Sequence, residues 1–276
     1  MMENIKQHSL YTHNLGWFYY RYYYKDLGKA DANNDFSGKN QALINCSLSQ
    51  EDVIELSNYH IEHTTIYPGL VFGTGITHQT GEKNENEFKL GLFFDHTTGN
   101  PMIPGSSVKG LLRSVFPNSI KKKKTDTEEV INNQRYREPR RKYILKILNE
   151  LLAKPSEMID INIDNLENEI FEGFTENGEE KTLIPIYQRD IFFDAYPVKV
   201  KNKFLGIDYI TPHYNAKLKN PIPVQFLKIM PGVTFQFNFN LNNGLIKSQE
   251  KLALFNRILS DIGIGAKTNV GYGQFK

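Results

Sequence analysis

The chain has 276 residues and a formal net charge of +2, so it is long enough to bury a substantial core, as one elaborated domain or two small ones. The mild charge means that any affinity for nucleic acid must come from local basic patches, and the single cysteine, Cys46, excludes an internal disulfide and a cysteine-based zinc site. No apolar run approaches the roughly 18 residues of a membrane span, and the N-terminus lacks a signal-peptide core. These features predict a soluble, cytoplasmic protein.

The first distinctive stretch is residues 16–25, in which seven aromatic side chains accompany Arg21 and Lys25. Aromatic rings with nearby cations can stack bases and hold phosphates. The same rings can belong to the core, because aromatic side chains bury large areas and tyrosine keeps a polar end for the surface. We favour the structural interpretation. Residues 28–41 follow as a predicted loop rich in glycine, asparagine and aspartate.

A helix is predicted from Ser49, as its N-cap, through about His60, because apolar residues follow the serine at helical spacing. His60 and His63 could then share a helical face, but no third ligand stands at a convincing spacing for a metal site. Residues 66–77, with a bend at their glycines, and residues 88–96 are predicted as extended runs. We expect these two runs to be neighbours in one sheet.

The clearest predicted helix covers residues 106–116. Ser106 or Ser107 is expected to cap it, and apolar residues at the i, i+3, i+4 and i+7 positions form a buried stripe. Lys109 and Arg113 share the opposite face. A helix N-terminus with exposed N–H groups and a nearby lysine is a possible phosphate site. A solvated helix face is the alternative.

Residues 117–181 form a predicted insertion that is partly mobile and contains one or two helices. Its first part is basic and includes the lysine run 121–124, which is either simply solvated or able to steer a nucleic acid at low salt. An amphipathic run covers 144–152. Residues 156–181 are acidic and polar, so we expect them to lie away from any phosphate.

Ordered structure is expected to return after the insertion, at residues 183–196, 204–214 and 223–230, followed by a strand at 235–241. The last is the clearest, because apolar residues alternate with glutamine and asparagine. Pro231 and Gly232 are expected to turn one strand into the next. Residues 248–262 form the second predicted amphipathic helix, with Gly263 at its C-cap position.

The chain ends in a glycine-rich loop, residues 263–275, which contains four glycines and Lys267. Glycine takes positive φ without penalty and allows close approach of the backbone, so such a loop can point successive N–H groups and a lysine at a phosphate. The alternative is a turn that leads into a last strand at 268–275, with Gly271 and Gly273 marking a bulge. A P-loop and a dinucleotide fingerprint are excluded, because each needs a helix after the glycines.

The order strand, helix, strands, helix, glycine loop and strand is compatible with a ferredoxin-like α+β layer, in which helices cover one face of an antiparallel sheet. Five motifs follow one another at residues 69–75, 103–113, 193–197, 210–214 and 263–273: GLVFGTG, IPGSSVKGLLR, FDAYP, ITPHY and GIGAKTNVGYG. With these motifs the chain resembles the RAMP superfamily of CRISPR proteins, and most closely the RAMP subunit that caps the guide-3′ end of the type III-B (Cmr) effector complex.

The resemblance implies a single RAMP domain with a modified RRM-like fold over residues 1–276, with an N-terminal extension over about 1–65 and the insertion at about 117–181. It implies RNA contacts from the start of the first clear helix and from the glycine-rich loop, by Ser106, Ser107, Lys109, Arg113, Gly263, Gly265, Lys267, Thr268, Asn269, Gly271, Tyr272 and Gly273. The implied partners are guide RNA, target RNA, other RAMP subunits and the small helical subunit of the type III-B complex. No cofactor, metal or membrane contact is expected.

In such complexes an aspartate of the repeated backbone subunit cuts the target RNA, so the resemblance implies a subunit without chemistry of its own. The sequence agrees, because it has no Ser/His/Asp, Cys/His or metal constellation. The rival interpretation is a guide-processing endoribonuclease of the same superfamily, with a histidine as general acid or base. None of the seven histidines sits in a recognisable catalytic pattern. A third interpretation is a structural cap without RNA contact.

Overall fold

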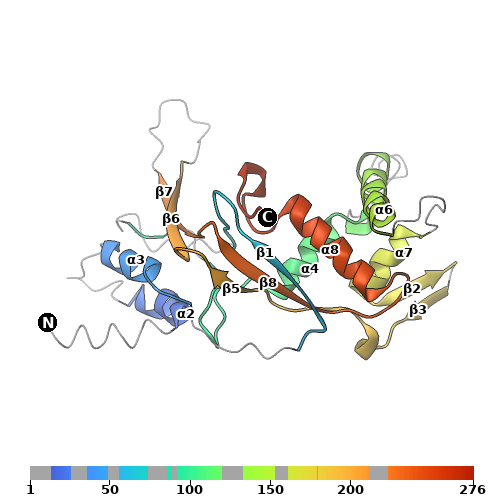
Figure 1. Ribbon diagram of the computed structural model, residues 1–276, viewed down its shortest axis with the longest axis horizontal. Coiled ribbons are helices and arrows are strands. Elements are labelled where there is room, and N and C mark those ends of the chain that lie inside the picture. Colours follow the sequence, from blue (N-terminus) through green and yellow to red (C-terminus); the bar gives the residue numbers. More distant parts are fainter. Residues whose placement is uncertain are drawn as a thin grey trace.

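The computed structural model describes residues 14–25, 36–48, 56–73, 86–88, 92–119, 133–152, 161–178, 180–211 and 223–276. Its centre is an antiparallel sheet built on β8 (Val233–Asn240), as Figure 1 shows. β1 (Tyr59–Thr64) pairs with one edge of β8. β4 (Ile191–Phe192) and β5 (Tyr196–Val200) pair with its other edge, one after the other. The central strand is therefore bonded on both sides.

The C-terminal residues extend this sheet beyond β1. Phe275 forms an antiparallel bridge with Thr65, and Lys276 and Thr64 exchange backbone hydrogen bonds of 3.0 and 3.3 Å. The spatial order is therefore the C-terminal residues, β1, β8, and then β4 with β5. One helix follows β1 in the chain and another follows β8, which is the ferredoxin-like arrangement.

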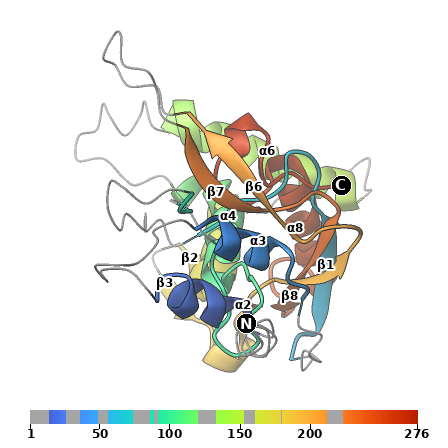
Figure 2. The same cartoon turned by 90° about the vertical axis from the view of Figure 1, so that its left-hand side faces the viewer.

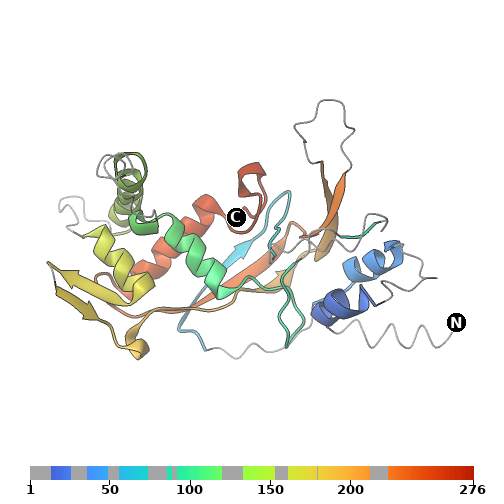
Figure 3. The same cartoon turned by 180° about the vertical axis from the view of Figure 1, so that it is seen from behind.

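Two helices, α4 (Gly105–Ser114) and α8 (Ser248–Ile262), lie side by side on one face of the sheet (Figure 1, Figure 3). Phe235, Phe237 and Phe239 of β8 are fully buried. The ring of Phe239 lies 5.5 Å from that of Phe255 on α8. The alternation predicted for β8 and the bounds predicted for α8 are confirmed, and so is the α+β fold with helices on one face of an antiparallel sheet.

Further elements lie at the two ends of this core (Figure 1). At the end that Figure 2 faces are α2 (Leu15–Trp17), η1 (Phe18–Tyr22), α3 (Ser37–Ile44) and the paired strands β6 (Leu205–Ile210) and β7 (Val224–Ile229). At the other end are η2 (Pro117–Ser119), η3 (Asn133–Arg137), α6 (Glu138–Leu152), α7 (Ile163–Glu167), η4 (Asn168–Glu172), β2 (Phe174–Asn177), β3 (Glu180–Leu183) and η5 (Ile186–Gln188). Among the described helices, none is both long and apolar enough to cross a lipid bilayer.

The N-terminal aromatic run belongs to the core. Phe18, Tyr19 and Tyr23 are fully buried, and the Tyr23 hydroxyl group donates a hydrogen bond of 2.6 Å to Asn40 Oδ1 on α3. The structural interpretation of this run is therefore confirmed for its buried rings. The predicted loop at 28–41 is wrong in its described part, because α3 begins inside it.

The helix predicted to run through His60 is wrong over its described end. Residues 59–64 form β1 instead, while the predicted N-cap, Ser49, lies outside the described residues. The strand is favoured because alternate side chains, including His63, pack into the core against β8, and this tertiary contact outweighs local helical spacing. His60 is exposed on the opposite face of β1, so the two histidines do not share a face.

The two extended runs expected next are not neighbours in one sheet. In the described part of the first run, residues 66–73, only Leu70 makes a β-bridge, and its partner is Ile229. In the second run Phe94 bridges Pro101. The glycines and prolines near these runs favour turns, which interrupt regular strand pairing.

The N-terminus of α4 is capped from a distant part of the chain. The helix predicted here is confirmed, but neither Ser106 nor Ser107 is its N-cap. Pro104 occupies that position without a side-chain bond, and the Gly105 N–H group donates a hydrogen bond of 2.7 Å to the Asp194 carboxylate. A carboxylate at this place satisfies a free N–H group and interacts favourably with the helix dipole.

Replacement of Asp194 by alanine should therefore lower the free energy of unfolding by about 1 kcal/mol. Asp194→Asn, which keeps an acceptor oxygen, should lower it less. Ser106→Ala should change it by less than about 0.5 kcal/mol, because the serine side chain does not cap the helix. Urea unfolding followed by circular dichroism measures all three values. Equal losses in Ser106→Ala and Asp194→Ala would contradict the assignment of the cap.

Candidate functional site

The start of α4 and the glycine-rich loop after α8 line one cleft of about 430 Å³. From the sequence alone, these two segments are separate candidate phosphate sites. The cleft is lined by Phe72, Gly73, Phe93, Ile103, Pro104, Ser107, Leu111, Ile264, Gly265 and Ala266. Most of these side chains are apolar, and none is titratable. A site of this composition can hold a flat or apolar group, but its lining offers no acid, base or metal ligand.

The glycine-rich loop passes repeatedly through left-handed backbone conformations, at Gly263, Gly265, Lys267, Gly271 and Gly273. A Cβ atom at Gly273 would overlap the carbonyl oxygen of Ile264, so packing within the protein requires glycine there. At Gly271 the nearest atom to such a Cβ would be Pro68 Cδ, 3.4 Å away. Only its φ of 96° restricts that position.

Most N–H groups of the loop bond within the protein. Ala266 N donates to Val71 O at 2.7 Å, and Gly273 N donates to Gly69 O at 2.8 Å. These two bonds attach the loop to the GLVFGTG motif. They also remove donors that a phosphate cradle along the whole loop would need.

The tip of the loop is a single 3₁₀ turn, η6 (Thr268–Val270). The predicted last strand at 268–275 is therefore wrong. Of these residues only Phe275 forms a β-bridge, and its partner is Thr65, the residue that follows β1. The first N–H groups of a helical turn have no partner within it. Within the described part of the chain, no backbone acceptor bonds Thr268 N or Asn269 N. The donors for an anion are thus concentrated at this tip, next to Lys267.

Tyr272 connects the loop to the β6–β7 pair. Its hydroxyl group donates to Asp208 Oδ2 at 2.6 Å, and Lys228 Nζ lies 2.6 Å from the same oxygen. Burial alone would raise the pKa of Asp208, but hydrogen bonds from Lys228, Tyr272 and the Tyr209 N–H group outweigh burial and lower it. Burial, followed by the bond to Asp208, raises the pKa of Tyr272. The Tyr272 hydroxyl is therefore used within the protein.

Lys109 and Arg113 lie on the side of α4 away from the cleft, because Ser107 and Leu111 occupy the cleft side. Arg113 Nη1 lies 2.5 Å from Glu172, and Arg113 Nε lies 3.3 Å from Glu167. Lys109 Nζ lies 5.7 Å from the centre of the Phe192 ring. The acidic segment expected to avoid phosphate sites thus pairs with one of the predicted phosphate contacts.

The described histidines do not form a catalytic set. His63 is only 5% exposed and lies against the rings of Phe237 and Phe275. Burial lowers its pKa, although the neighbouring Asn256 side chain opposes this shift. Among the described residues, no group of three or more histidine, cysteine, aspartate or glutamate side chains could hold a metal ion. His8, His13, His78 and His213 lie outside the described residues.

A family model described as "RAMP superfamily" matches residues 62–276. The chain belongs to the RAMP superfamily. This match covers both helices of the core, the cleft and the glycine-rich loop, so the family predicted from the five motifs is confirmed. The last three residues of the ITPHY motif, 212–214, lie outside the described residues.

Curated relatives include the CRISPR system Cmr subunit Cmr6 of Pyrococcus furiosus, which is 27% identical over an alignment of 234 residues; the match covers 70% of this chain and 63% of that protein. Cmr6 of Saccharolobus solfataricus is 25% identical over an alignment of 193 residues, and the match covers 68% of this chain and 49% of that protein. The chain thus spans about half to two thirds of the length of these relatives.

Similar solved structures include a chain of a type III-B Cmr-beta complex bound to cognate target RNA. It is 26% identical, with a TM-score of 0.46, and the match covers 79% of this chain and 57% of that one. The crystal structure of Cmr6 from Pyrococcus furiosus is 23% identical, with a TM-score of 0.41, and the match covers 79% of this chain and 97% of that one.

Sequence reasoning missed the apolar lining of the cleft in this RAMP domain. Phe72 and Ile103 stand inside two of the quoted motifs, so attention to apolar motif positions could have found them. Phe93 lies outside every motif and was placed only as part of an extended run. Its contribution depends on how the chain folds back from Pro101, which no local pattern indicates.

Gly271 and Gly273, which follow the loop tip, should respond differently to substitution. Gly273→Ala should destabilise the free protein by more than about 2 kcal/mol, because a backbone carbonyl occupies the place of the new Cβ. Gly271→Ala should cost about 1 kcal/mol, the usual penalty of a left-handed conformation. Gly110→Ala, in open space on α4, is the control and should not destabilise. Thermal and urea unfolding rank the three variants, and equal losses at Gly271 and Gly273 would contradict this account.

The hydrogen bonds of Asp208 should make part of the free energy of unfolding depend on pH. Because the pKa of Asp208 is lower in the folded protein, its contribution is complete above the ordinary carboxyl range and is lost as the pH falls through the folded pKa. Asp208→Asn should be less stable at neutral pH, yet lose less further stability between about pH 6 and pH 3. Melting curves across this range test the difference. Parallel pH profiles for the variant and the wild type would exclude a role for this carboxylate.

Proposed function

We propose that this RAMP protein is a non-catalytic RNA-binding subunit of a type III-B CRISPR effector complex. In this role it binds guide RNA near its 3′ end and caps the backbone filament in antiviral defence. The observation that carries the proposal is the shared cleft, where the glycine-rich loop and the start of α4 meet around a lining without titratable groups. The Cmr6 names of its curated relatives support the choice of complex.

The proposed contacts divide between the cleft and the loop tip. Lys267 and the N–H groups of Thr268 and Asn269 supply positive charge and donors for a phosphate. Phe72 and Phe93 in the cleft offer apolar surface for a base or a ribose. RNA recognised in this way is held mainly through its backbone and base faces, so little dependence on guide sequence is expected.

The other predicted RNA contacts take different parts in this proposal. Gly263, Gly265 and Gly273 act by shaping the loop, because a Cβ at each would overlap backbone atoms of the protein. Ser107 lines the cleft at the start of α4, where its hydroxyl group can donate a hydrogen bond to RNA, and Ser106 stands next to it on the same turn without lining the cleft. Arg113 contributes least to RNA binding, because two carboxylates neutralise its charge.

The proposed partners are guide RNA, target RNA, other RAMP subunits and the small helical subunit of the type III-B complex. One similar structure is described as a Cmr complex bound to target RNA, which agrees with these partners. A filament cap needs a surface for its neighbours in addition to the RNA cleft.

Lys267→Ala should weaken binding of guide RNA to a similar extent for unrelated guide sequences, and should lower the salt slope of the association constant by roughly 0.7. Arg113→Ala should leave RNA binding nearly unchanged and lower stability instead. Lys146→Ala, which removes a lysine 73% exposed on α6, controls for general loss of charge. Filter binding at several salt concentrations measures all three.

A loss that depends on guide sequence, or an equal effect of Lys146→Ala, would contradict the proposed role of Lys267. The same samples report on catalysis when a repeat RNA is included and the products are separated on gels. Intact RNA agrees with a non-catalytic subunit. Cleavage that disappears in a histidine-to-alanine variant would favour the endoribonuclease interpretation.

A further inference from the structure

Large apolar side chains are exposed on the last residue of β3 and on η5, the turn that follows it. Figure 1 shows β3 at the end of the molecule away from the β6–β7 pair. Leu183, Ile186 and Tyr187 are 67%, 79% and 80% exposed. Scattered single apolar residues are common on protein surfaces, but three within five positions of one short segment are not. This segment lies far along the chain from the glycine-rich loop, and RNA binding at the cleft does not explain it.

The backbone beside these side chains is an open strand edge. β2 and β3 form a separate two-stranded sheet. The outer edge of β2 is covered at Glu176, because the Asn165 side chain accepts a hydrogen bond from Glu176 N at 2.8 Å and donates one of 3.0 Å to Glu176 O. The amide group of Asn165 thus takes the place of a neighbouring strand.

The outer edge of β3 has no such cover among the described residues. Ile184 N donates to Gly173 O at 2.9 Å, and in an antiparallel pair alternate residues point their N–H and C=O groups inward and outward. Lys181 and Leu183 therefore point these groups away from β2. All four residues of β3 are exposed.

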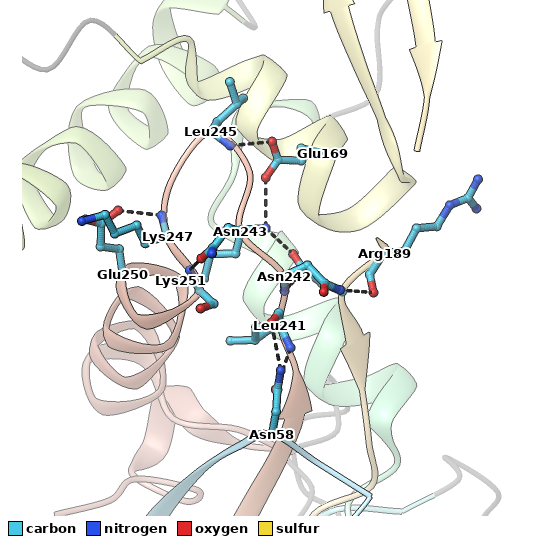
Figure 4. A network of polar contacts seen from close by, with 12 residues as sticks. Asn58, Glu169, Arg189, Leu241, Asn242, Asn243, Leu245, Lys247, Glu250 and Lys251 are labelled. Atoms are coloured by element: carbon cyan, nitrogen blue, oxygen red, sulfur yellow. Dashed lines mark hydrogen bonds and ion pairs between the residues drawn. The ribbon is translucent and has the colours of Figure 1, made fainter. Parts of the chain in front are cut away.

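The exposed segment is held in place by bonds that do not involve its exposed side chains. Arg189 Nε donates to Ile184 O at 2.8 Å, and Asn242 Nδ2 donates to Arg189 O at 3.1 Å. The next residue, Asp190, forms a buried ion pair of 2.7 Å with Lys251 on α8. Figure 4 shows how Arg189, Asn242 and Lys251 belong to one polar network. The backbone of this segment is thus held in one conformation, whereas its apolar side chains remain exposed to solvent, so binding there would cost little conformational entropy of the backbone.

We propose that the outer edge of β3, together with Leu183, Ile186 and Tyr187, binds an extended strand of another protein subunit of the assembly. The strand would exchange backbone hydrogen bonds with Lys181 and Leu183 and place apolar side chains on Ile186 and Tyr187. The inference rests on the proposed function in one respect, since it assumes that the protein works within a multisubunit complex. It does not depend on RNA binding.

A second copy of this chain is a weaker candidate for the occupant. One aromatic and two aliphatic side chains on a four-residue strand cover roughly half of the ~800 Å² per partner of a standard interface. A dimer held by this edge alone would fall short of that area. A neighbour in a larger assembly can use the edge as one part of a wider contact.

The test compares hydrogen exchange of the free protein with that of the complex purified from its own host through a tagged copy of this chain. In the free protein the amides of Lys181 and Leu183 should exchange quickly, and in the complex their protection should rise by about tenfold or more. Protection that stays unchanged on assembly overturns the proposal. Protection that rises with the concentration of the isolated protein indicates self-pairing and also overturns it.

A matched pair of variants tests the edge itself. Lys181→Pro removes the outward N–H group but leaves the inward bonds to β2, whereas Lys181→Ala removes the same side chain and keeps the N–H group. Recovery of Lys181→Pro in the complex should be lost, and recovery of Lys181→Ala should match the wild type. Equal recovery contradicts strand addition. Circular dichroism checks folding, and the wild-type exchange data remain decisive if the proline variant does not fold.

Hydrogen exchange and RNA binding also test strand binding at β3 and the RNA-binding role independently of each other. Guide RNA binding by the isolated protein should be the same for both Lys181 variants. Failure of the wild-type protein to bind guide RNA counts against the RNA-binding role alone, while the exchange data still report on the β3 edge.

Discussion

Three phenylalanines on one face of β8 must be buried away from water, and the positions of α4 and α8 follow from how these rings are covered. Each buried aromatic side chain contributes a few kcal/mol of transfer free energy, more than most single polar contacts on the surface. α4 and α8 supply the cover, with Phe255 packing on Phe239. In a ferredoxin-like layer these helices run in opposite directions, so α4 starts at the end where α8 finishes. The cleft is the space between those two helix ends.

The parts of the fold that follow from local patterns could be predicted from the sequence. The bounds of α8, the alternation of β8 and the turn at Gly232 each depend on residues a few positions apart. The fold class followed from the order of these elements and from the five motifs. The start of β1 could not be predicted locally, because its residues take strand conformation only through pairing with a segment about 180 positions later.

In the candidate site, too, the local features could be predicted from the sequence and the contacts between distant residues could not. The glycine-rich loop and the start of α4 were recognised from residue type and spacing, but their meeting in one cleft is a tertiary result. Arg113 was expected to be available to phosphate because its carboxylate partners, Glu167 and Glu172, lie more than fifty positions away. The cap of α4 comes from Asp194, 89 positions distant. A charge or a cap can be located in a sequence, whereas its partner often cannot.

The buried charges at Lys251 attach η4 to α8 and to the segment before β4. Its ammonium group lies 2.7 Å from Asp190 and 3.0 Å from Glu169, and all three side chains are at most 6% exposed. Burial raises the pKa of Asp190 although Lys251 opposes this shift. Desolvation of such a group of charges costs free energy, and removal of one member strongly destabilises the folded protein. Glu169 brings η4 into this network, so the segment that leads to β2 is anchored to α8 (Figure 4).

The Asn165 side chain makes the two outer edges of the small β2–β3 sheet different from each other. A sheet with two open edges can grow on either side, and identical sheets of that kind can join edge to edge without limit. Here the Asn165 side chain occupies the outward N–H and C=O groups of Glu176 on β2, which disfavours strand addition on that side. Under the proposed strand addition, one strand can join at β3, while Asn165 leaves no matching place at Glu176 for a second copy of the same sheet.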